Sequence, residues 1–443
     1  MTTPTAGTPQ PLLRSRDAIA IIVGIVVGAG IFKTPSMVAG VTGDVGWVVV
    51  AWVFGALLSL AGALCYAELA TTYPHAGGDY HFLTRAFGRN PSFLYAWARA
   101  TVINTGSIAL LAFVFGDYMS KVVPLPAAMW AATIVVILTL VNVIGLRASS
   151  RTQTILTILE VAGLVAVAVA GFLAPPLAEA SPAAFSSSPP LGLFGLAMVF
   201  VLLTYGGWNE AAYISAELRG GRRAIVPVLV ISIAILGLLY VLVNLALLNG
   251  LGLKALADSK AAGADVMART FGNGGAQLLS VFVAIAALTS INATMIVGAR
   301  TNYAVARDWP ALRFMGGWHE ERGTPVTALI VQGVIALALV AFGALQHDGF
   351  ESMVEFTAPV FWTFLFLVGV ALFRLRSIDA TAERPFRVPL YPVTPILFCA
   401  ACAWLAWSSI SYAASRNAVH ISLIVMAVGV VALLVTRMTR RAA

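Results

Sequence analysis

Two glycine-containing strings lie inside apolar segments of the chain, and their chemistry is that of backbone groups. The first string is GAGIF at 28–32, and the second is YGGWN at 205–209. Glycine allows a helix to unwind, which releases backbone N–H and C=O groups from their intrahelical hydrogen bonds. Released N–H groups of Gly28, Ala29 and Gly30 can receive a carboxylate, helped by the positive end of the following half-helix. Released carbonyl groups near the second string can accept hydrogen bonds from an ammonium group.

The candidate binding residues are therefore those at and beside the two strings. They are Val27, Gly28, Ala29, Gly30, Ile31, Leu203, Thr204, Tyr205, Gly206 and Gly207. An alternative is that the glycines only let neighbouring helices pack closely, as small residues do in membrane helices. Two separate clusters with polar flanks at matching depth favour a binding site.

The composition places both strings inside a membrane. Of the 443 residues, 60% are hydrophobic and only 10% are charged, with a mean hydropathy of +0.90. Soluble domains contain about 25% charged residues. Apolar stretches of roughly 20 residues recur from end to end, and each can cross a bilayer about 30 Å thick. We expect an all-α, polytopic membrane protein whose first stretch is retained, because it lacks the cleavage site of a signal peptide.

About twelve membrane-spanning helices are expected from these stretches. Their ranges are 17–42, 46–70, 91–120, 126–146, 151–174, 191–218, 224–250, 275–305, 325–346, 353–373, 391–412 and 419–437. The glycine strings fall in the first and the sixth helix. Unwound backbone is tolerated in a bilayer only where it lines a cavity, and one break in each half of a chain indicates a transporter's substrate site.

The positions of the breaks predict a five-plus-five inverted repeat followed by two further helices. The expected parts are a cytoplasmic tail at 1–13, a first repeat at 14–174, a second repeat at 191–373, helices eleven and twelve at 391–437, and a tail at 438–443. A short surface helix is expected within 250–274, and an amphipathic helix within 73–90.

The formal net charge of +8 is a topology signal and does not indicate nucleic-acid binding. With an even number of spans, most arginines fall on the side that also holds both termini. The opposite side has only Lys121, Lys254, Lys260, Arg269 and Arg416. Because basic residues favour cytoplasmic loops, both termini are expected to face the cytoplasm, with the chain in the cytoplasmic membrane.

Three charged residues near the strings are candidates for coupling or gating. A carboxylate at membrane depth is costly and by default indicates function, so Glu160 is expected to hold a proton, bind sodium or pair with a base such as Arg300. Glu210 follows the second string and has either a functional or a packing role. Lys33 either faces the outer vestibule, where it would disfavour cationic substrates, or extends toward lipid headgroups.

The remaining polar residues form no recognisable catalytic or metal site. Cys399 and Cys402 form a C-x-x-C inside an apolar helix without further ligands, which disfavours a metal site. No G-x-S-x-G, P-loop or H-E-x-x-H motif is present. We therefore expect no enzymatic activity, no metal and no cofactor. Glu68 and Asp79 are expected to act in a gate or to anchor a loop.

The chain resembles the amino acid–polyamine–organocation superfamily, and within it the prokaryotic members of the L-type amino-acid transporter branch. Beside the strings at 28–32 and 205–209, the matching strings are CYAEL at 65–69, GGDY at 77–80 and YPVTP at 391–395. They follow the family's order and spacing over nearly the whole chain. The resemblance implies a LeuT-like fold with helices one and six broken, and transport of amino acids.

Departures from the family's pattern carry expectations of their own. Light chains of heteromeric members bond a glycoprotein through a cysteine between helices three and four, whereas 121–126 has none, so no disulfide-linked partner is expected. Ala29 replaces a common serine, Leu203 an aromatic gate, and Glu160 a lysine that occupies the ion site of sodium-coupled cousins. Asn292 resembles an asparagine near the relatives' binding site.

We expect a secondary transporter for an α-amino acid, preferably neutral, because no carboxylate lies inside either string. The resemblance implies alternating access by rocking of helices one, two, six and seven, with proton coupling or exchange. The alternatives are a cationic amino acid or polyamine bound through Glu210 or Glu160, and sodium symport using Thr289 or Ser290. A membrane transferase would need an acid cluster or a His-Asp pair, and a channel would need pore-lining rings; the sequence indicates neither.

Overall fold

The computed structural model describes residues 15–75, 77–145, 150–177, 183–211, 225–416 and 419–442. Within these ranges the regular structure is helical, and the one β-type pairing is an isolated bridge between His319 and Thr324. The predicted tail at 1–13, the predicted sixth helix beyond 211, and residue 443 lie outside the described residues.

Nine helical stretches of the described residues are long and apolar enough to cross a membrane. They are α3 (Val45–Thr72), the continuous run of α5 (Arg89–Ala98), the π-helical η2 (Arg99–Ile103) and α6 (Asn104–Met119), α7 (Ala127–Ile144), α11 (Ile225–Leu251), α13 (Ala262–Asp308), α14 (Val326–Ala344), α15 (Gly349–Ile378), α16 (Val393–Ser415) and α17 (Val419–Ala442). Shorter helices are α4 (Asp79–Phe87), α12 (Leu253–Asp258) and η5 (Pro310–Met315). The predicted amphipathic and surface helices correspond to α4 and α12.

The three other predicted spans are two interrupted helices and the continuous helix α8. The first consists of α1 (Ser15–Val26), the 3₁₀ turn η1 (Ala29–Phe32) and α2 (Thr34–Thr42), the fifth is α8 (Ser150–Leu173), and the sixth consists of α9 (Leu191–Thr204) and α10 (Trp208–Ala211). Extended backbone at Gly28 separates α1 from η1, and Gly207, with a φ of 110°, lies between α9 and α10. A positive φ favours glycine, because other residues meet steric strain there. The predicted breaks in helices one and six are confirmed.

The predicted eighth span, 275–305, is the part of α13 that follows a bend. α13 begins at Ala262 and bends at Gly272, where φ is 72° and the backbone is not helical, so the turns before the bend precede the predicted span. The tenth span, predicted at 353–373, begins earlier, at Gly349. The Asp348 carboxylate accepts a hydrogen bond from the Glu351 N–H at 3.0 Å and thereby caps α15.

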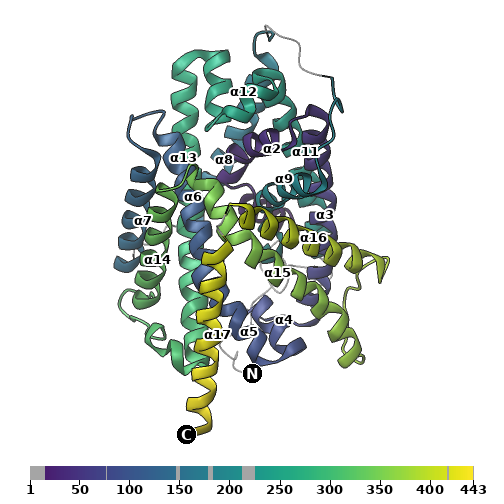
Figure 1. Cartoon of the computed structure of the whole chain (residues 1–443), viewed down its shortest axis with the longest axis vertical. Coiled ribbons are helices and arrows are strands. Elements are labelled where there is room, and N and C mark those ends of the chain that lie inside the picture. Colours follow the sequence, from purple (N-terminus) through teal and green to yellow (C-terminus); the bar gives the residue numbers. More distant parts are fainter. Residues whose placement is uncertain are drawn as a thin grey trace, which may run out of the picture.

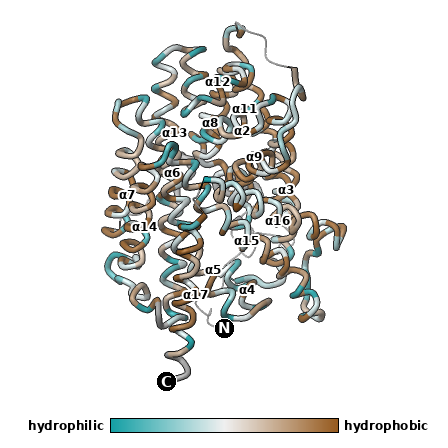
Figure 2. Tube along the Cα trace, viewed as in Figure 1, coloured by the Kyte–Doolittle hydropathy of each residue, from teal (hydrophilic) through white to brown (hydrophobic). Residues whose placement is uncertain are grey.

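The helices form an elongated bundle (Figure 1). Near one end, at the top of the picture, α2 and α12 pack together, whereas α4, α5 and the end of α17 lie toward the other end. Figure 2 shows apolar residues along α7 and α14. Large apolar side chains such as Leu57, Ile137 and Leu140 are exposed on the bundle. Such a surface is what a membrane-spanning bundle presents to lipid.

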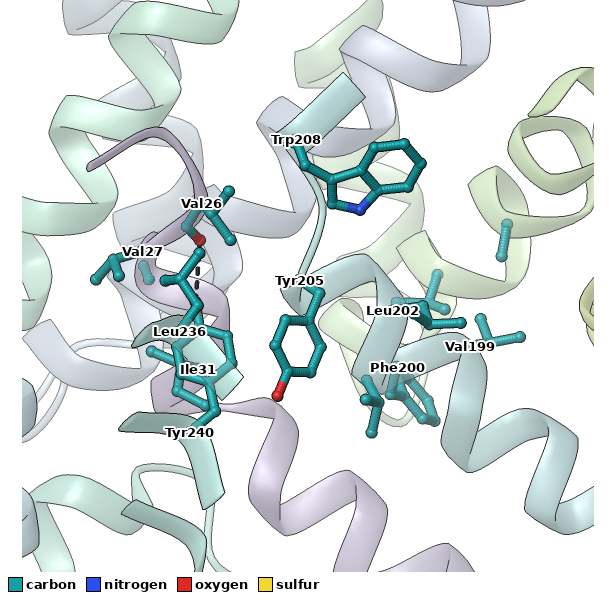
Figure 3. Close-up of a cluster of buried hydrophobic side chains, with 14 of the residues drawn as sticks. Val26, Val27, Ile31, Val199, Phe200, Leu202, Tyr205, Trp208, Leu236 and Tyr240 are labelled. Atoms are coloured by element: carbon teal, nitrogen blue, oxygen red, sulfur yellow. Dashed lines mark hydrogen bonds between the residues drawn. The ribbon is translucent and has the colours of Figure 1, made fainter. Parts of the chain in front are cut away.

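Buried aromatic residues hold the broken helices in place at the centre of the bundle. The rings of Tyr205 and Tyr240 lie 4.9 Å apart, and the ring of Trp52 on α3 contacts both. The Tyr240 hydroxyl donates to the carbonyl of Val26 at the end of α1, at 3.0 Å (Figure 3). The Tyr205 hydroxyl donates to the carbonyl of Trp52 at 3.1 Å. The end of α1 and the end of α9 are thereby attached to α11 and α3.

Candidate binding site

A cavity of about 780 Å³ lies between the two helix breaks. Its wall also includes residues of α6, α8, α13 and α15. Cavities of about 300–1,000 Å³ are typical of small-molecule sites. The predicted binding residues that line it are Gly28, Gly30, Leu203, Thr204, Gly206 and Gly207.

At the first break, two of the three predicted N–H donors remain available. The N–H of Gly28 donates to the carbonyl of Val26 at 2.9 Å, so this group is occupied. Ala29 and Gly30 begin the 3₁₀ turn, and the first N–H groups of a helical turn have no acceptor within that turn. An anion in the cavity can therefore bind at Ala29 and Gly30, where the dipole of the turn also favours negative charge.

At the second break, the carbonyl groups at the end of α9 differ in their availability. The N–H of Gly206 donates to the carbonyl of Leu203 at 3.2 Å. In a continuous helix, the carbonyls of Thr204 and Tyr205 would accept hydrogen bonds from the N–H groups four residues later. The turn at Gly207 displaces those donors into α10, so the two carbonyl groups are left as acceptors beside the cavity.

The two broken helices meet directly through hydroxyl groups. Thr34 begins α2, Thr204 ends α9, and both side chains line the cavity. Their hydroxyl oxygens lie 2.7 Å apart, and both side chains are buried. This contact holds the second half of helix one against the first half of helix six.

Other predicted binding residues do not present side chains to the cavity. Val27, Ala29 and Ile31 are completely buried in the packing around the first break, and Tyr205 is turned toward Trp52. The side chain of Asn292 accepts a hydrogen bond at 2.7 Å from the amide of Asn142 on α7. Asn292 is therefore directed toward α7, and neighbouring residues of α13 line the cavity in its place.

Glu160 is brought to the cavity wall by α8. It is only 6% exposed, and Gly28, Thr289 and Ser290 line the same cavity. The predicted alternative of an ion pair with Arg300 does not agree with the structure, because Arg300 is exposed and does not line the cavity. The side chain of Glu210 lies outside the described part of the structure, while its backbone belongs to α10.

Lys33 lies neither in an outer vestibule nor among lipid headgroups, and both predicted positions are wrong. Its side chain is fully buried, and its Nζ lies 2.9 Å from Asp117 Oδ2 on α6 and 3.5 Å from Asp348 Oδ2 at the start of α15. A buried ammonium is costly unless oppositely charged groups surround it, and the two aspartates supply that charge. We call these three residues the Lys33 cluster.

Asp117 and Asp348 were not among the residues predicted from the amino acid sequence. The amino acid sequence did contain a signal. Asp117 lies near the end of the predicted span 91–120, Asp348 lies just before the span 353–373, and both positions are on the side of the membrane toward which the second half of the first span, with Lys33, extends. Beneath the cluster, the Lys33 ammonium lies 5.9 Å from the ring centre of Phe350, and Phe350 stacks on Phe200 at 6.5 Å. Both rings line the cavity. At this end the cavity is covered by an aromatic layer and then by an ionic layer.

At the opposite end of the bundle, Glu68 attaches a loop to α3. Its carboxylate accepts hydrogen bonds from Arg376 at 2.7 and 2.5 Å and from the N–H of Val388 at 2.6 Å. Asp79 accepts a hydrogen bond from the Tyr95 hydroxyl at 3.0 Å. Of the two predicted roles, these contacts fit loop anchoring.

No group of three or more His, Cys, Asp and Glu side chains in the described ranges could hold a metal ion. Cys65, Cys399 and Cys402 are buried free thiols. The chemistry available in the cavity is therefore reversible binding by backbone groups, hydroxyls, amides and one carboxylate.

The amino acid sequence shows what the chain is similar to. The profile of the family described as "Amino acid permease" matches residues 13–433. The b(0,+)-type amino acid transporter 1 of Mus musculus is 29% identical over 398 residues, which cover 86% of this chain and 79% of that protein. The Cystine/glutamate transporter of Homo sapiens is 28% identical, with coverages of 87% and 78%. The Large neutral amino acids transporter small subunit 2 of Mus musculus is 28% identical, with coverages of 87% and 74%.

Proposed function

This chain belongs to the amino acid permease family, in its L-type branch, and from that premise we propose that it carries a neutral α-amino acid by alternating access. As a family member it is a multi-pass membrane transporter and not an enzyme. The observation that carries the proposal is the position of the cavity, which lies between the two helix breaks.

The two charged ends of an amino acid find complementary backbone groups at the two breaks. The substrate carboxylate binds to the N–H groups of Ala29 and Gly30, and the substrate ammonium donates to the carbonyls of Thr204 and Tyr205. The contact between Thr34 and Thr204 keeps these donors and acceptors on facing helices.

A neutral substrate side chain follows from the charge of the cavity wall. Glu160 is the one charged side chain among the described lining residues. If Glu160 serves coupling, no counter-charge remains for a cationic side chain, and burying an unpaired charge is costly. The second candidate, a cationic amino acid or polyamine, is favoured by the same residue, which would then bind the substrate directly.

Glu160 couples transport to a proton or supports obligatory exchange in this proposal. A carboxylate that lines a substrate cavity can change its charge when the cavity opens to either side of the membrane. Sodium would use the same carboxylate together with the hydroxyl oxygens of Thr289 and Ser290, which line the same cavity. Imposed gradients of proton and sodium distinguish the two couplings.

The orientation in the membrane is also part of the proposal. The end of the bundle with α4, α5 and the end of α17 faces the cytoplasm, because basic residues such as Arg85, Arg89 and Arg437 belong to these helices. The membrane is the cytoplasmic membrane. The chain acts without a disulfide-linked partner, since its three cysteines are all buried.

Uptake by the purified protein in liposomes tests the proposal. A panel of labelled amino acids is offered under imposed proton or sodium gradients, with and without internal substrate. We expect uptake of a neutral amino acid that a proton gradient or internal substrate stimulates. Absence of uptake of every amino acid would overturn the proposal, and uptake driven by sodium alone would replace its coupling mechanism.

A matched pair of glycine variants locates the site. A Cβ on Gly30 would lie 3.7 Å from Thr204 Oγ1, so Gly30→Val places its branched methyl groups between the two breaks. We expect it to reduce uptake of every substrate by at least about tenfold, the effect of 1.4 kcal/mol in binding. Gly40→Val on α2 is the control, because a Cβ there meets only Ala257 at 3.9 Å. Equal activity of the two variants would argue against a site at the breaks.

A further inference from the structure

Four polar residues line the cavity wall supplied by α6, α13 and α15. They are Asn104, Ser107, Thr294 and Thr357. Thr357 lies against α6 beside Ser107, since a Cβ on Gly106 would collide with Thr357 Cγ2. Asn104 lies against α13, where a Cβ on Gly298 would come within 2.8 Å of its Nδ2. Thr294 is one helical turn before Gly298. We call these four residues the polar band.

Apolar residues of the same helices flank the polar band along the cavity. On α15, Phe350 and Val354 precede Thr357 and Phe361 follows it, and all of them line the cavity. On α6, Leu110 and Leu111 follow Ser107 along the same wall. The polar groups of α6 and α15 are thus confined to one level of the wall, whereas α13 also presents Thr289 and Ser290.

The hydroxyl groups of the polar band face the cavity as hydrogen-bond acceptors. Ser107 donates to the carbonyl of Ile103 at 2.8 Å, Thr294 to that of Ser290 at 2.9 Å, and Thr357 to that of Met353 at 2.8 Å. Because a hydroxyl has a single hydrogen, only its lone pairs remain for a ligand. A ligand group beside these side chains must therefore donate a hydrogen bond.

The amide nitrogen of Asn104 is directed toward Gly298 on α13 and not into the cavity. This atom, Nδ2, is buried and has no hydrogen-bond partner, and the residue is 7% exposed. This nitrogen lies beside Gln332 Oε1, which is also buried, so it is not a donor to a ligand in the cavity. A hydroxyl or carboxamide group matches the band through its own donor, which can reach the hydroxyl oxygens of Ser107, Thr294 and Thr357.

Charged and apolar side chains fit the polar band less well. None of its four members carries a charge, so an ammonium or guanidinium group would be buried without a counter-ion. A carboxylate would meet three acceptor oxygens. An aliphatic side chain would offer no hydrogen-bond donor to the hydroxyl oxygens of the band.

We propose that the polar band binds the side chain of the transported amino acid and selects an uncharged side chain that carries a hydroxyl or carboxamide group. This inference rests on the proposed function, because the breaks must hold the carboxylate and ammonium for the side chain to reach the band. It names the substrate class as amino acids of the serine, threonine, asparagine and glutamine type.

Competition between substrates of equal size tests the selection. Threonine is compared with valine, and asparagine with leucine, as inhibitors of uptake into liposomes that contain the purified protein. Lysine and glutamate are tested in the same assay as inhibitors with charged side chains. We expect the hydroxyl or carboxamide member of each pair to inhibit about tenfold more strongly, a ratio equivalent to 1.4 kcal/mol. Equal inhibition by both members, or strongest inhibition by lysine or glutamate, would overturn the inference.

Variants of the polar band identify the residues responsible. Thr294→Val and Thr357→Val remove the hydroxyl and keep the shape, and we expect each to reduce the preference for threonine over valine by at least threefold. Thr363→Val is the control, because Thr363 lies on α15, donates to the carbonyl of Pro359 at 2.7 Å and does not line the cavity. The same change in all three variants, or no change in any, would contradict the assignment.

The proposed function and the role of the polar band can be disproved separately. If the wild-type protein takes up no amino acid, the proposed function is wrong. If it takes up amino acids but prefers valine and leucine, the function stands and the role of the polar band is wrong. Gly30→Val gives a further check, since it should weaken all substrates without changing the ratio of threonine to valine.

Discussion

In the proposed mechanism, Glu160 is the residue that takes up and releases the coupling proton. It is nearly inaccessible to solvent, it lines the cavity, and no other described lining residue is charged. The sequence identified it because a carboxylate in a membrane helix is costly to keep without a function. The structure adds that the carboxylate lies on the wall of the proposed substrate site, where bound substrate and bound proton can influence each other.

We expect Glu160→Gln to abolish the pH dependence of uptake while leaving amino-acid binding measurable. Glutamine has nearly the size of a protonated glutamate but cannot release a proton. Uptake by liposomes is measured over a range of external pH, and binding by the shift in thermal stability on adding substrate. Glu383→Gln is the control, because Glu383 is exposed and outside the cavity wall. Unchanged pH-dependent uptake in Glu160→Gln would remove Glu160 from the mechanism.

At the scale of helices and loops, one buried carboxylate fixes both the start of α3 and the position of a neighbouring connection. Asp44 precedes α3, and its Oδ1 accepts hydrogen bonds from the N–H groups of Gly46 and Trp47 at 2.8 and 3.2 Å. The same carboxylate accepts from the N–H of Phe185 at 3.0 Å and from the hydroxyl of Ser186 at 3.1 Å. One side chain therefore caps α3 and holds the connection between α8 and α9.

The attachment of this connection should depend on pH in the acid range. Burial raises the pKa of Asp44, but hydrogen bonds from the backbone of Phe185, Trp47 and Ser187 lower it to about 2 overall. Because this is below the ordinary value of 3.8, the stabilisation is complete above about pH 4 and is lost as the pH falls toward 2. Hydrogen exchange at residues 183–190 measures it.

We expect protection from exchange at 183–190, measured relative to an unstructured chain at the same pH, to be high near neutral pH and to fall as the carboxylate is protonated. Asp44→Ala should lower this protection near neutral pH, whereas Asp348→Ala, which removes the cap of α15, should leave it unchanged. Protection that is independent of both pH and Asp44 would show that other contacts hold the connection.

At the scale of the whole molecule, the Lys33 cluster joins three helices that must separate if the cavity is to open at this end. Lys33 precedes α2, Asp117 is on α6 and Asp348 precedes α15. The stacked rings of Phe200 and Phe350 lie beneath it. If the ion pairs form in the closed state and are lost in the open state, they stabilise the closed state relative to the open one. Weakening them should therefore shift the population toward the open state.

We expect Lys33→Met to expose the cavity from the side of the Lys33 cluster. Leu111, which lines the cavity, is replaced by cysteine in an otherwise unchanged chain whose own thiols are buried. A membrane-impermeant maleimide added from outside the cell should then react about tenfold faster in the Lys33→Met background, as a population shift of 1.4 kcal/mol would produce. Lys121→Met is the control, because Lys121 pairs with Asp265 at 2.9 Å on the exposed surface. Equal labelling in both backgrounds would contradict a gating role.

The amino acid sequence by itself determined the features that depend on local chemistry. Apolar length specified the spans, and the glycines at Gly28 and Gly207 marked the breaks, because a helix unwinds where backbone freedom is greatest. The order of the strings also identified the family. The amino acid sequence did not determine the directions in which side chains point. Asn292 was predicted to lie at the binding site, but its side chain contacts Asn142 on α7.

Only the tertiary structure decided which residues meet. Lys33 finds Asp117 and Asp348 at separations of 84 and 315 residues along the chain. The polar band combines residues of three helices. The spacing of Asn104 and Ser107 indicates only that these two share one face of α6, and not that Thr294 and Thr357 line the same cavity. Helices that are apolar all round show no periodic pattern from which their inward face can be read. Their rotation is therefore set by the packing of the whole bundle, and with it the chemistry of the cavity.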